Sequence, residues 1–182
     1  TENTYVIFTS DNGPWTQYKH HAGKAHPLRG SKGTSYEGGY RVPCVMWAPG
    51  RIPADTESNA IASTIDLLPT IATLTGVELN TRGPIDGKDI SALIQGKGPS
   101  TRNDMLFYSS QGTLSGYRQG DYKLVRNQPN QAFELYHLKE DIGEQTNLLV
   151  TLPEKAAALK AQMIELDQHL HAEARSHGTI QP

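Results

Sequence analysis

A short apolar segment that ends abruptly in two polar residues constrains the fold of this chain more than any other feature. Residues 6–8 are valine, isoleucine and phenylalanine, a pattern typical of a strand buried on both faces in a parallel sheet. Asp11 and Asn12 follow, and Gly13-Pro14 then forces the chain to turn. Because open α/β sheets bind ligands just beyond the carboxyl ends of their strands, we expect a metal or an anionic substrate at Asp11 and Asn12. Alternatively, these two side chains only satisfy backbone groups of the turn.

The composition excludes several classes of function. With 182 residues, 36% of them hydrophobic, the chain suffices for one domain or one and a half. Its 17 basic and 19 acidic residues give a formal charge of -2, so nucleic acid is not expected as the main partner. No apolar segment is long enough to span a membrane. The single cysteine, Cys44, excludes an internal disulfide and a local cysteine-based zinc site, and it leaves the cellular compartment open.

The start of the chain predicts that part of the fold lies elsewhere. The chain begins at Thr1 without a signal peptide, and a core strand follows almost at once, as in a processed or excised piece. A buried parallel strand needs neighbours on both edges, and too few parallel-type strands follow to supply them. We therefore expect missing elements to complete the sheet.

The first half of the chain combines a long loop with short regular elements. Residues 13–41 lack periodicity and are punctuated by glycine, histidine, lysine and proline, which indicates an active-site loop. Asp66 is expected near the N-cap of a helix that Gly76 ends. The elements expected after the loop are strands at 42–48 and around 61–65, a helix over 66–76 and a short helix over 89–95.

The second half changes to short strands at regular spacing, which predicts an antiparallel meander. The strands are expected at 105–109, 113–118, 122–126 and 133–138, with turns at 120–121 and 128–130. From Leu152 to Leu170, apolar residues recur at spacings of four and three, so an amphipathic helix is expected to pack on the meander. The fold class is therefore α/β, with a domain at 1–98 that carries the loop 13–41, and a small antiparallel-sheet domain with a C-terminal helix at 99–182.

A basic, glycine-rich segment at 27–43 has the composition of an oxyanion site. Glycines allow the backbone to approach a ligand closely, while Lys32 offers a compact positive charge with three donors, and Arg29 and Arg41 add further charge. The spacing of a nucleotide-binding Walker loop is absent, because Lys32 precedes its glycine and no qualifying glycine lies before it. For Glu37 and Arg41, an ion pair that braces the loop is expected rather than a catalytic role.

Several short segments occur in a specific order along nearly the whole chain. They are F-T-S-D-N-G-P at 8–14, P-L-R-G-S-K-G-T at 27–34, Y-E-G-G-Y-R-V-P at 36–43, W-A-P-G at 47–50, S-T-I-D-L-L-P-T at 63–70, D-G-K-D-I at 86–90, G-D-Y-K-L at 120–124 and L-Y-H-L-K-E-D at 135–141. This ordered set resembles the sulfatase family. The resemblance implies the C-terminal portion of an arylsulfatase-like enzyme of the alkaline phosphatase superfamily, in a periplasmic, secreted or lysosome-like location.

The resemblance also implies roles for particular residues. Asp11 and Asn12 match the pair that binds a divalent cation in sulfatases, usually calcium, with magnesium as the alternative. Lys32 matches the lysine that contacts the sulfate and stabilises its oxygens as charge builds. The nucleophile of the family is formylglycine, made from the first residue of a C/S-x-P-x-R motif. That motif is absent here, and Cys44 lies in a strand context, where a small core residue is expected.

These departures predict an incomplete active site. The nucleophile and the remaining metal ligands are expected upstream of this chain, in a missing N-terminal part that would be its partner. Calcium needs about six to eight oxygens, of which Asp11 and Asn12 supply only a few, so the chain alone should bind calcium weakly. We expect the isolated chain not to hydrolyse sulfate esters, and the complete enzyme to act on a sulfated small molecule or glycan.

Other polar residues have more open roles. The histidines of the loop lack the helical spacing or cysteine partners of a zinc site. His20 and His26, together with Arg29, are expected to contact the substrate at the rim, and ligation of a transition metal by the histidines is the alternative. Asp66 is expected to cap its helix, and His137 to be a surface substitution.

Rival functions stay open from the sequence. A phosphomonoester or phosphonate hydrolase of the same superfamily would share an anion cradle. A non-catalytic module could bind sulfated glycans through Arg29, Lys32 and Arg41. The meander and the C-terminal helix alone would also be compatible with a structural remnant.

Overall fold

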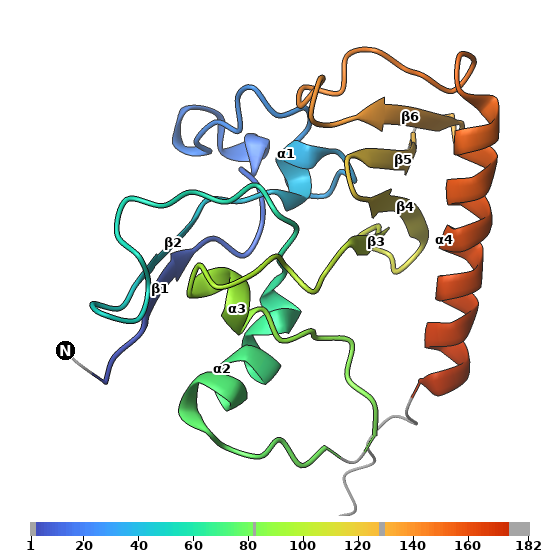
Figure 1. Ribbon diagram of the computed structural model, residues 1–182. Coiled ribbons are helices and arrows are strands. Elements are labelled where there is room, and N and C mark those ends of the chain that lie inside the picture. Colours follow the sequence, from blue (N-terminus) through green and yellow to red (C-terminus); the bar gives the residue numbers. More distant parts are fainter. Residues whose placement is uncertain (1–2, 82, 128–129, 175–182) are drawn as a thin grey trace, which may run out of the picture.

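The chain folds into two adjoining regions (Figure 1), a β-ribbon with short helices and a four-stranded antiparallel sheet that a long helix covers. The computed structural model describes residues 3–81, 83–127 and 130–174. In chain order the elements are β1 (Val6–Thr9), the 3-10 helix η1 (Thr16–His21), α1 (Glu37–Tyr40), β2 (Cys44–Trp47), the 3-10 helix η2 (Thr64–Asp66), α2 (Leu67–Thr75), α3 (Ser91–Ile94), β3 (Asp104–Tyr108), β4 (Leu114–Gln119), β5 (Tyr122–Arg126), β6 (Phe133–His137) and α4 (Pro153–Glu173).

The first expected strand forms as β1, but its pairing and its burial differ from the prediction. β1 pairs antiparallel with β2, with Val6 opposite Trp47 and Thr9 opposite Cys44. Phe8 is 70% exposed, so the prediction of a parallel strand buried on both faces is wrong for the described residues. Cys44 is exposed, and the prediction that it packs in a core is also wrong. An apolar run indicates that a strand needs cover on both faces, but it does not say which segment provides that cover.

Helix α2 confirms the helix expected over 66–76. Asp66 accepts the backbone N–H of Ser63 at 2.9 Å in a capping box, and Gly76, with a φ of 71°, ends the helix. The strand predicted around 61–65 is wrong, because this capping box bends the chain into η2 instead. Helix α3 forms inside the short helix expected at 89–95.

Asp66 also belongs to a buried ion pair that the sequence analysis missed. Arg102 donates from Nε and Nη2 to the two carboxylate oxygens at 2.7 and 2.5 Å, and the backbone N–H of Lys88 adds a bond at 2.8 Å. Burial alone would raise the pKa of Asp66, but these hydrogen bonds outweigh it and lower the pKa below its ordinary value. The pair ties the start of α2 to the segment that leads into β3.

The antiparallel meander is confirmed, with the strand order β3-β4-β5-β6. Gly120, with a φ of 58°, forms the tight turn between β4 and β5. The turn expected at 128–130 falls partly on residues 128–129, which lie outside the described residues. His137, expected at the surface, is half-buried. Its ring lies edge-on to that of Tyr122, with 4.6 Å between the ring centroids.

The expected amphipathic helix forms as α4, with Pro153 in its first turn. Its buried residues Ala156, Leu159 and Met163 pack on one face of the meander. Their partners in the sheet are Tyr117, Leu124 and Leu135. Full burial of a leucine such as Leu159 is worth about 1.5–3 kcal/mol, so this face is the main core of the region. None of the helices among the described residues has the length and apolar character needed to cross a membrane.

Candidate active site

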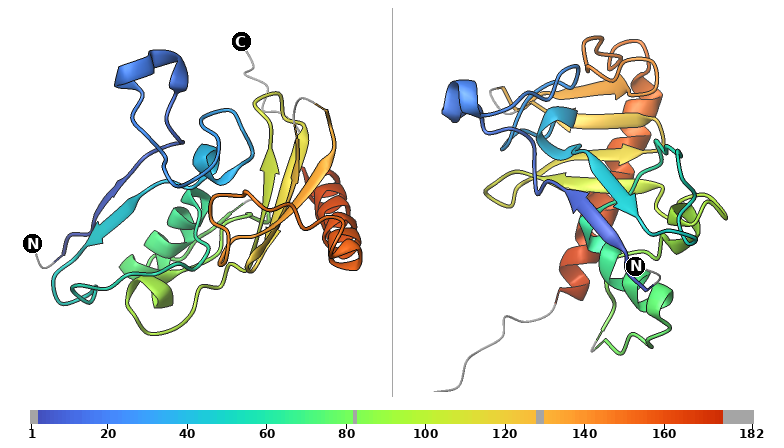
Figure 2. Two further views of the ribbon diagram at one scale, coloured as in Figure 1. Left: turned by 90° about the horizontal axis from the view of Figure 1, so that it is seen from above. Right: turned by 90° about the vertical axis from the view of Figure 1, so that its left-hand side faces the viewer.

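The segment that carries the predicted oxyanion site docks on the face of the meander opposite α4 (Figure 2). The hydroxyl oxygens of Ser35 and of Ser115 in β4 lie 2.5 Å apart and are buried. Tyr36 packs against a second buried apolar cluster on this face, formed by Val125, Tyr136 and Leu138. Residues 29–41 of the expected active-site loop are therefore anchored to the sheet.

Glycine backbones bring the two halves of the candidate site together. The N–H of Gly13 donates to the carbonyl oxygen of Gly39 at 3.0 Å, and the N–H of Lys32 donates to that of Pro14 at 3.1 Å. A Cβ atom on Gly13 would overlap the carbonyl oxygen of Gly38, so only glycine fits this crossing. The turn after β1 and the loop around Lys32 are consequently held as adjoining segments.

Asp11, Asn12 and Lys32 lie on these adjoining segments. Asp11 is exposed and Asn12 is half-buried, and the backbone carbonyl of Asn12 accepts the hydroxyl of Ser10 at 2.9 Å. Lys32 is exposed, with its Nζ 5.0 Å from the centroid of the Trp15 ring. Two hard oxygen donors and one ammonium group thus sit on an open surface, where a cation and an anion can reach them.

The histidines of the loop lie farther out. His20 belongs to η1, which projects away from the sheet (Figure 2), and His26 follows it, both with exposed side chains. Trp15 and Tyr18, at the base of η1, form an edge-to-face pair with ring centroids 4.9 Å apart. Among the described residues, no hydrogen bond or ion pair joins His20 or His26 to Asp11, Asn12 or Lys32.

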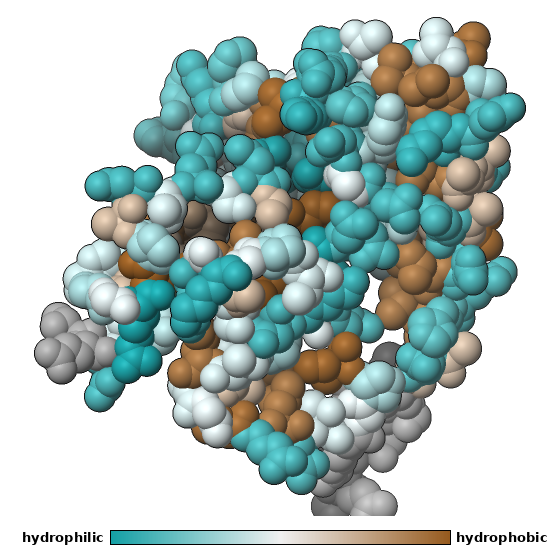
Figure 3. Space-filling model, viewed as in Figure 1, coloured by the Kyte–Doolittle hydropathy of each residue, from teal (hydrophilic) through white to brown (hydrophobic). Residues whose placement is uncertain are grey.

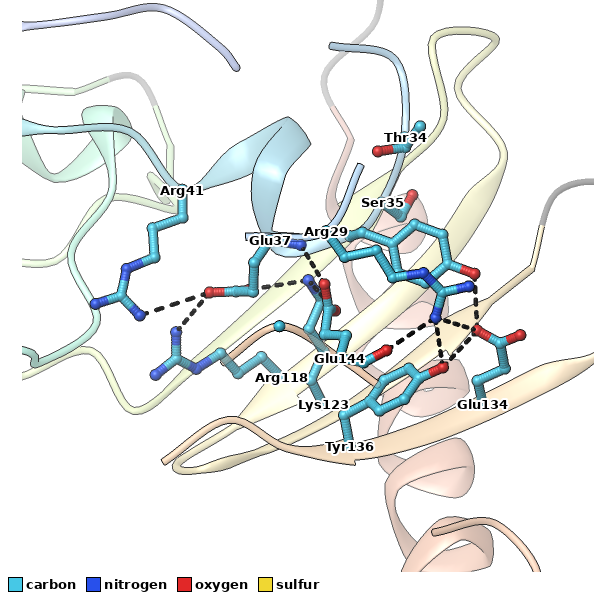
Figure 4. A network of polar contacts seen from close by, with 12 residues as sticks. Arg29, Thr34, Ser35, Glu37, Arg41, Arg118, Lys123, Glu134, Tyr136 and Glu144 are labelled. Carbon is cyan, nitrogen blue, oxygen red and sulfur yellow. Dashed lines mark hydrogen bonds and ion pairs between the residues drawn. The ribbon is translucent and has the colours of Figure 1, made fainter. Parts of the chain in front are cut away.

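Arg29 points into the protein rather than toward the open surface (Figure 4). Its Nη1 donates to the hydroxyl of Tyr136 at 2.7 Å and to the carbonyl oxygen of Glu144 at 3.0 Å. Its guanidinium lies over the ring of Tyr36, 3.9 Å from the centroid. Burial and the hydrogen bond to Glu134 raise the pKa of Tyr36 to about 12, so this hydroxyl stays a donor at neutral pH.

A second polar cluster, which we call the Glu37 cluster, consists of Glu37, Lys123 and Glu144 with Arg41 and Arg118 (Figure 4). Lys123 Nζ lies 2.8 Å from Glu37 Oε1 and 3.1 Å from Glu144 Oε1. The guanidinium groups of Arg118 and Arg41 lie 3.7 and 3.8 Å from Glu37 Oε2. The expected ion pair between Glu37 and Arg41 is confirmed, but Lys123 is the closer partner.

No local pattern in the sequence marks Lys123 or Glu144 as a site residue. Lys123 lies in the middle of β5, where both faces of the meander are covered, so an alternating pattern cannot single it out. Glu144 lies in an irregular segment after β6 and is fully buried. Burial raises the pKa of Glu144, while Lys123 and the N–H of Glu37 oppose that rise. The signal available for Lys123 was its place in the G-D-Y-K-L segment at 120–124, one of the segments that resemble the sulfatase family.

Comparison with known proteins identifies the family. Residues 1–77, which contain Asp11, Asn12 and Lys32, match the family model described as Sulfatase. Arylsulfatase A of Bos taurus is 36% identical over 178 residues, which cover 84% of this chain and 35% of the relative. The chain belongs to the sulfatase family. It is arylsulfatase-like, and it spans about a third of the length of this relative.

Solved structures extend the likeness over the meander and α4. The PsFucS1 sulfatase from Pseudoalteromonas sp. superimposes with a TM-score of 0.81 at 26% identity, over 97% of this sulfatase chain and 39% of that chain. A protein solved in complex with its substrate D-Glucosamine-2-N, 6-O-disulfate has a TM-score of 0.65 at 22% identity, over 92% of this chain and 34% of that chain, and so shares the fold. The expected α/β fold, with its four-stranded sheet and C-terminal helix, is that of the C-terminal part of sulfatases.

Proposed function

We propose that this chain is the C-terminal portion of a sulfatase that hydrolyses sulfate esters. In this proposal Asp11 and Asn12 bind a divalent cation and Lys32 contacts the sulfate. The observation that carries the proposal is the backbone crossing, in which Gly13 bonds to Gly39 and Lys32 bonds to Pro14. Because this crossing holds the turn at Asp11 next to the loop around Lys32, a cation bound at the turn and the ammonium group of Lys32 could contact the same sulfate group. The division into domains at 1–98 and 99–182 is part of the same proposal.

The donor chemistry of the turn fits calcium. Carboxylate and amide oxygens are the hard donors that calcium prefers, and Asp11 is exposed, with no ion pair to another described residue. Within the described ranges no group of three His, Cys, Asp or Glu residues could hold a metal, so further donors would come from the N-terminal part. A bound calcium ion would supply positive charge beside the ester and the nucleophile.

Lys32 would bind the sulfate oxygens through charge-assisted hydrogen bonds from its ammonium group. The ring of Trp15 beneath Nζ would limit the positions that the side chain adopts. The nucleophile would be a formylglycine in the N-terminal part, because no C/S-x-P-x-R motif occurs in this sequence. The roles of the chain itself are therefore to bind and to orient the sulfate group.

We infer that the substrate is a sulfated glycan, with a sulfated small molecule as the alternative. Between Asn12 and Tyr36 the chain has no acidic residue, whereas it has several basic ones, namely Lys19, Lys24, Arg29 and Lys32. Such a loop favours a ligand with more than one negative charge. His20 and His26 are proposed to contact it at the rim. For Arg29 the contacts favour a bracing role, since its Nη1 already bonds to Tyr136 and Glu144.

The test uses this chain joined to a formylglycine-bearing N-terminal part, with p-nitrophenyl sulfate as substrate. Replacing Lys32 by alanine should lower kcat/KM by about 100-fold, the loss typical of one donor to a developing oxyanion. Lys139→Ala is the control, because Lys139 is an exposed lysine outside this loop. Faster turnover of p-nitrophenyl phosphate than of the sulfate would instead favour the phosphomonoester hydrolase. Binding of a sulfated oligosaccharide without turnover would favour the non-catalytic module.

A further inference from the structure

We propose that Glu144, held by Lys123, is a positioning residue of the sulfatase site. Glu144 lies in the C-terminal region, yet it fixes both ends of the segment 29–37 that carries Lys32, and through that segment it fixes the turn at Asp11. This inference rests on the proposed function, because it gives the meander region a role in the site proposed there.

The three central ionic groups of the Glu37 cluster are buried. Lys123 and Glu144 have 0% exposed surface and Glu37 has 2%. Removing such charges from water is costly, and apolar side chains of similar volume often serve stability equally well. A buried lysine between two carboxylates is therefore poorly explained by stability alone, and a demand for a fixed geometry explains it better.

Glu144 bonds to both ends of the loop segment 29–37. Its carboxylate Oε2 accepts the backbone N–H of Glu37 at 2.7 Å, and its backbone carbonyl accepts Arg29 Nη1 at 3.0 Å. Lys123 Nζ forms an ion pair with the other carboxylate oxygen at 3.1 Å, which favours this direction of the side chain. One residue of the C-terminal region thus holds the beginning and the end of the segment that contains Lys32 (Figure 4).

Backbone hydrogen bonds join Glu37 and its helix to the turn at Asp11. Glu37 starts α1, and Gly38 in the same helix bonds through its N–H to the carbonyl oxygen of Arg29 at 2.7 Å. Gly39 accepts the N–H of Gly13 at 3.0 Å. Cβ atoms on Gly38 and Gly39 would overlap backbone oxygens of the loop, so no flexible side chain separates these segments. A shift of α1 is therefore passed directly to the turn that carries Asp11.

The experiment uses the complete enzyme with Glu144→Asp and Glu144→Leu. The aspartate keeps the negative charge but withdraws the acceptor from the N–H of Glu37, and the leucine removes the acceptor. Glu140→Asp is the matched control, because Glu140 is exposed on the same segment after β6. Leu159→Ala is a second control, since it weakens the core on the opposite face of the sheet, away from the loop.

Three quantities are measured below the melting temperature of each variant. They are the affinity for calcium ions by titration, kcat and KM for p-nitrophenyl sulfate, and hydrogen exchange of peptides that cover residues 11–14 and 36–40. We expect Glu144→Leu to lower calcium affinity and kcat by about 10- to 100-fold, the range for residues that hold metal ligands in position through hydrogen bonds. The loss in Glu144→Asp should be smaller. KM should change less than kcat, and both peptides should exchange faster. Both controls should retain wild-type values.

Two results would overturn the proposal. One is that neither Glu144 variant changes calcium affinity or exchange at 11–14. The other is that Leu159→Ala causes the same losses, because Glu144 would then act through global stability only. If Glu144→Leu does not fold, Glu144→Asp carries the test alone. Failure of the proposed function is distinguishable, because it appears in the wild type as no sulfate hydrolysis, whereas the exchange measurement does not depend on activity.

Discussion

At the scale of single residues, three glycines of the candidate site have a structural role that their composition does not reveal. The basic segment predicted glycines that let the backbone approach a ligand. In the structure Gly13, Gly38 and Gly39 let three backbone segments approach one another. The arrangement of the candidate site therefore depends on these three glycines.

Gly13 offers a direct prediction. A methyl group at this position would overlap the carbonyl oxygen of Gly38, and neither backbone can move without separating β1 from α1. We expect Gly13→Ala to cost about 1–3 kcal/mol of stability, the range for overpacking, and to lower calcium affinity in the complete enzyme. Gly83→Ala is the control, because a Cβ there meets no atom. Calcium titration and thermal unfolding check both variants, and wild-type affinity in Gly13→Ala would contradict the prediction.

At the scale of elements, the sequence predicts what depends on local patterns and fails where the partner is distant. The meander and α4 follow from alternation, turn residues and a helical stripe. The strands form within about one residue of the expected bounds, and α4 ends about three residues beyond them. The pairing of β1 depends on β2, which lies beyond the whole loop, and was mispredicted. Lys123 and Glu144 are polar residues whose partners lie far along the chain, so no local spacing reveals them.

The ion pair of Asp66 and Arg102 links the start of α2 to the segment before β3, and it makes the stability of the fold depend on pH. The pKa of Asp66 is lowered in the folded protein, so the pair contributes its full stability above the pKa of the unfolded chain, about 3.9. That stability is lost as the pH falls through the folded value. We expect Asp66→Asn to cost about 3–5 kcal/mol at neutral pH, because it leaves Arg102 buried without its counter-charge.

Urea unfolding at pH 7 and at pH 3 measures this dependence. The difference between wild type and Asp66→Asn should shrink at pH 3, because the carboxyl of the unfolded chain, with its pKa of about 3.9, then binds a proton that the folded ion pair excludes. Glu57→Gln is the control for loss of an exposed carboxylate and should show little effect at either pH. An equal difference at both pH values would show that the charge of Asp66 does not act through Arg102.

At the scale of the whole molecule, apolar side chains remain exposed on the region opposite the meander. Figure 3 shows such side chains gathered over α2, where Leu68 and Ile71 are exposed. A groove of about 250 Å³ between the β1–β2 ribbon and α2 is lined by apolar residues that include Ile7, Met46 and Leu74. Exposed apolar side chains that gather beside an apolar groove are typical of an interaction surface. We infer that the N-terminal part of the enzyme covers it.

If the N-terminal part covers this surface, the chain should depend on it for both calcium binding and hydrolysis. The isolated chain should bind calcium weakly and should not hydrolyse p-nitrophenyl sulfate, because it has few oxygen donors and no C/S-x-P-x-R motif. Addition of a formylglycine-bearing N-terminal part should restore hydrolysis and bury the groove, and Leu68→Asp together with Ile71→Asp should prevent both. Activity assays and cosedimentation measure these outcomes. Turnover by the isolated chain would contradict the prediction, because it would require a nucleophile within this chain, which has no C/S-x-P-x-R motif.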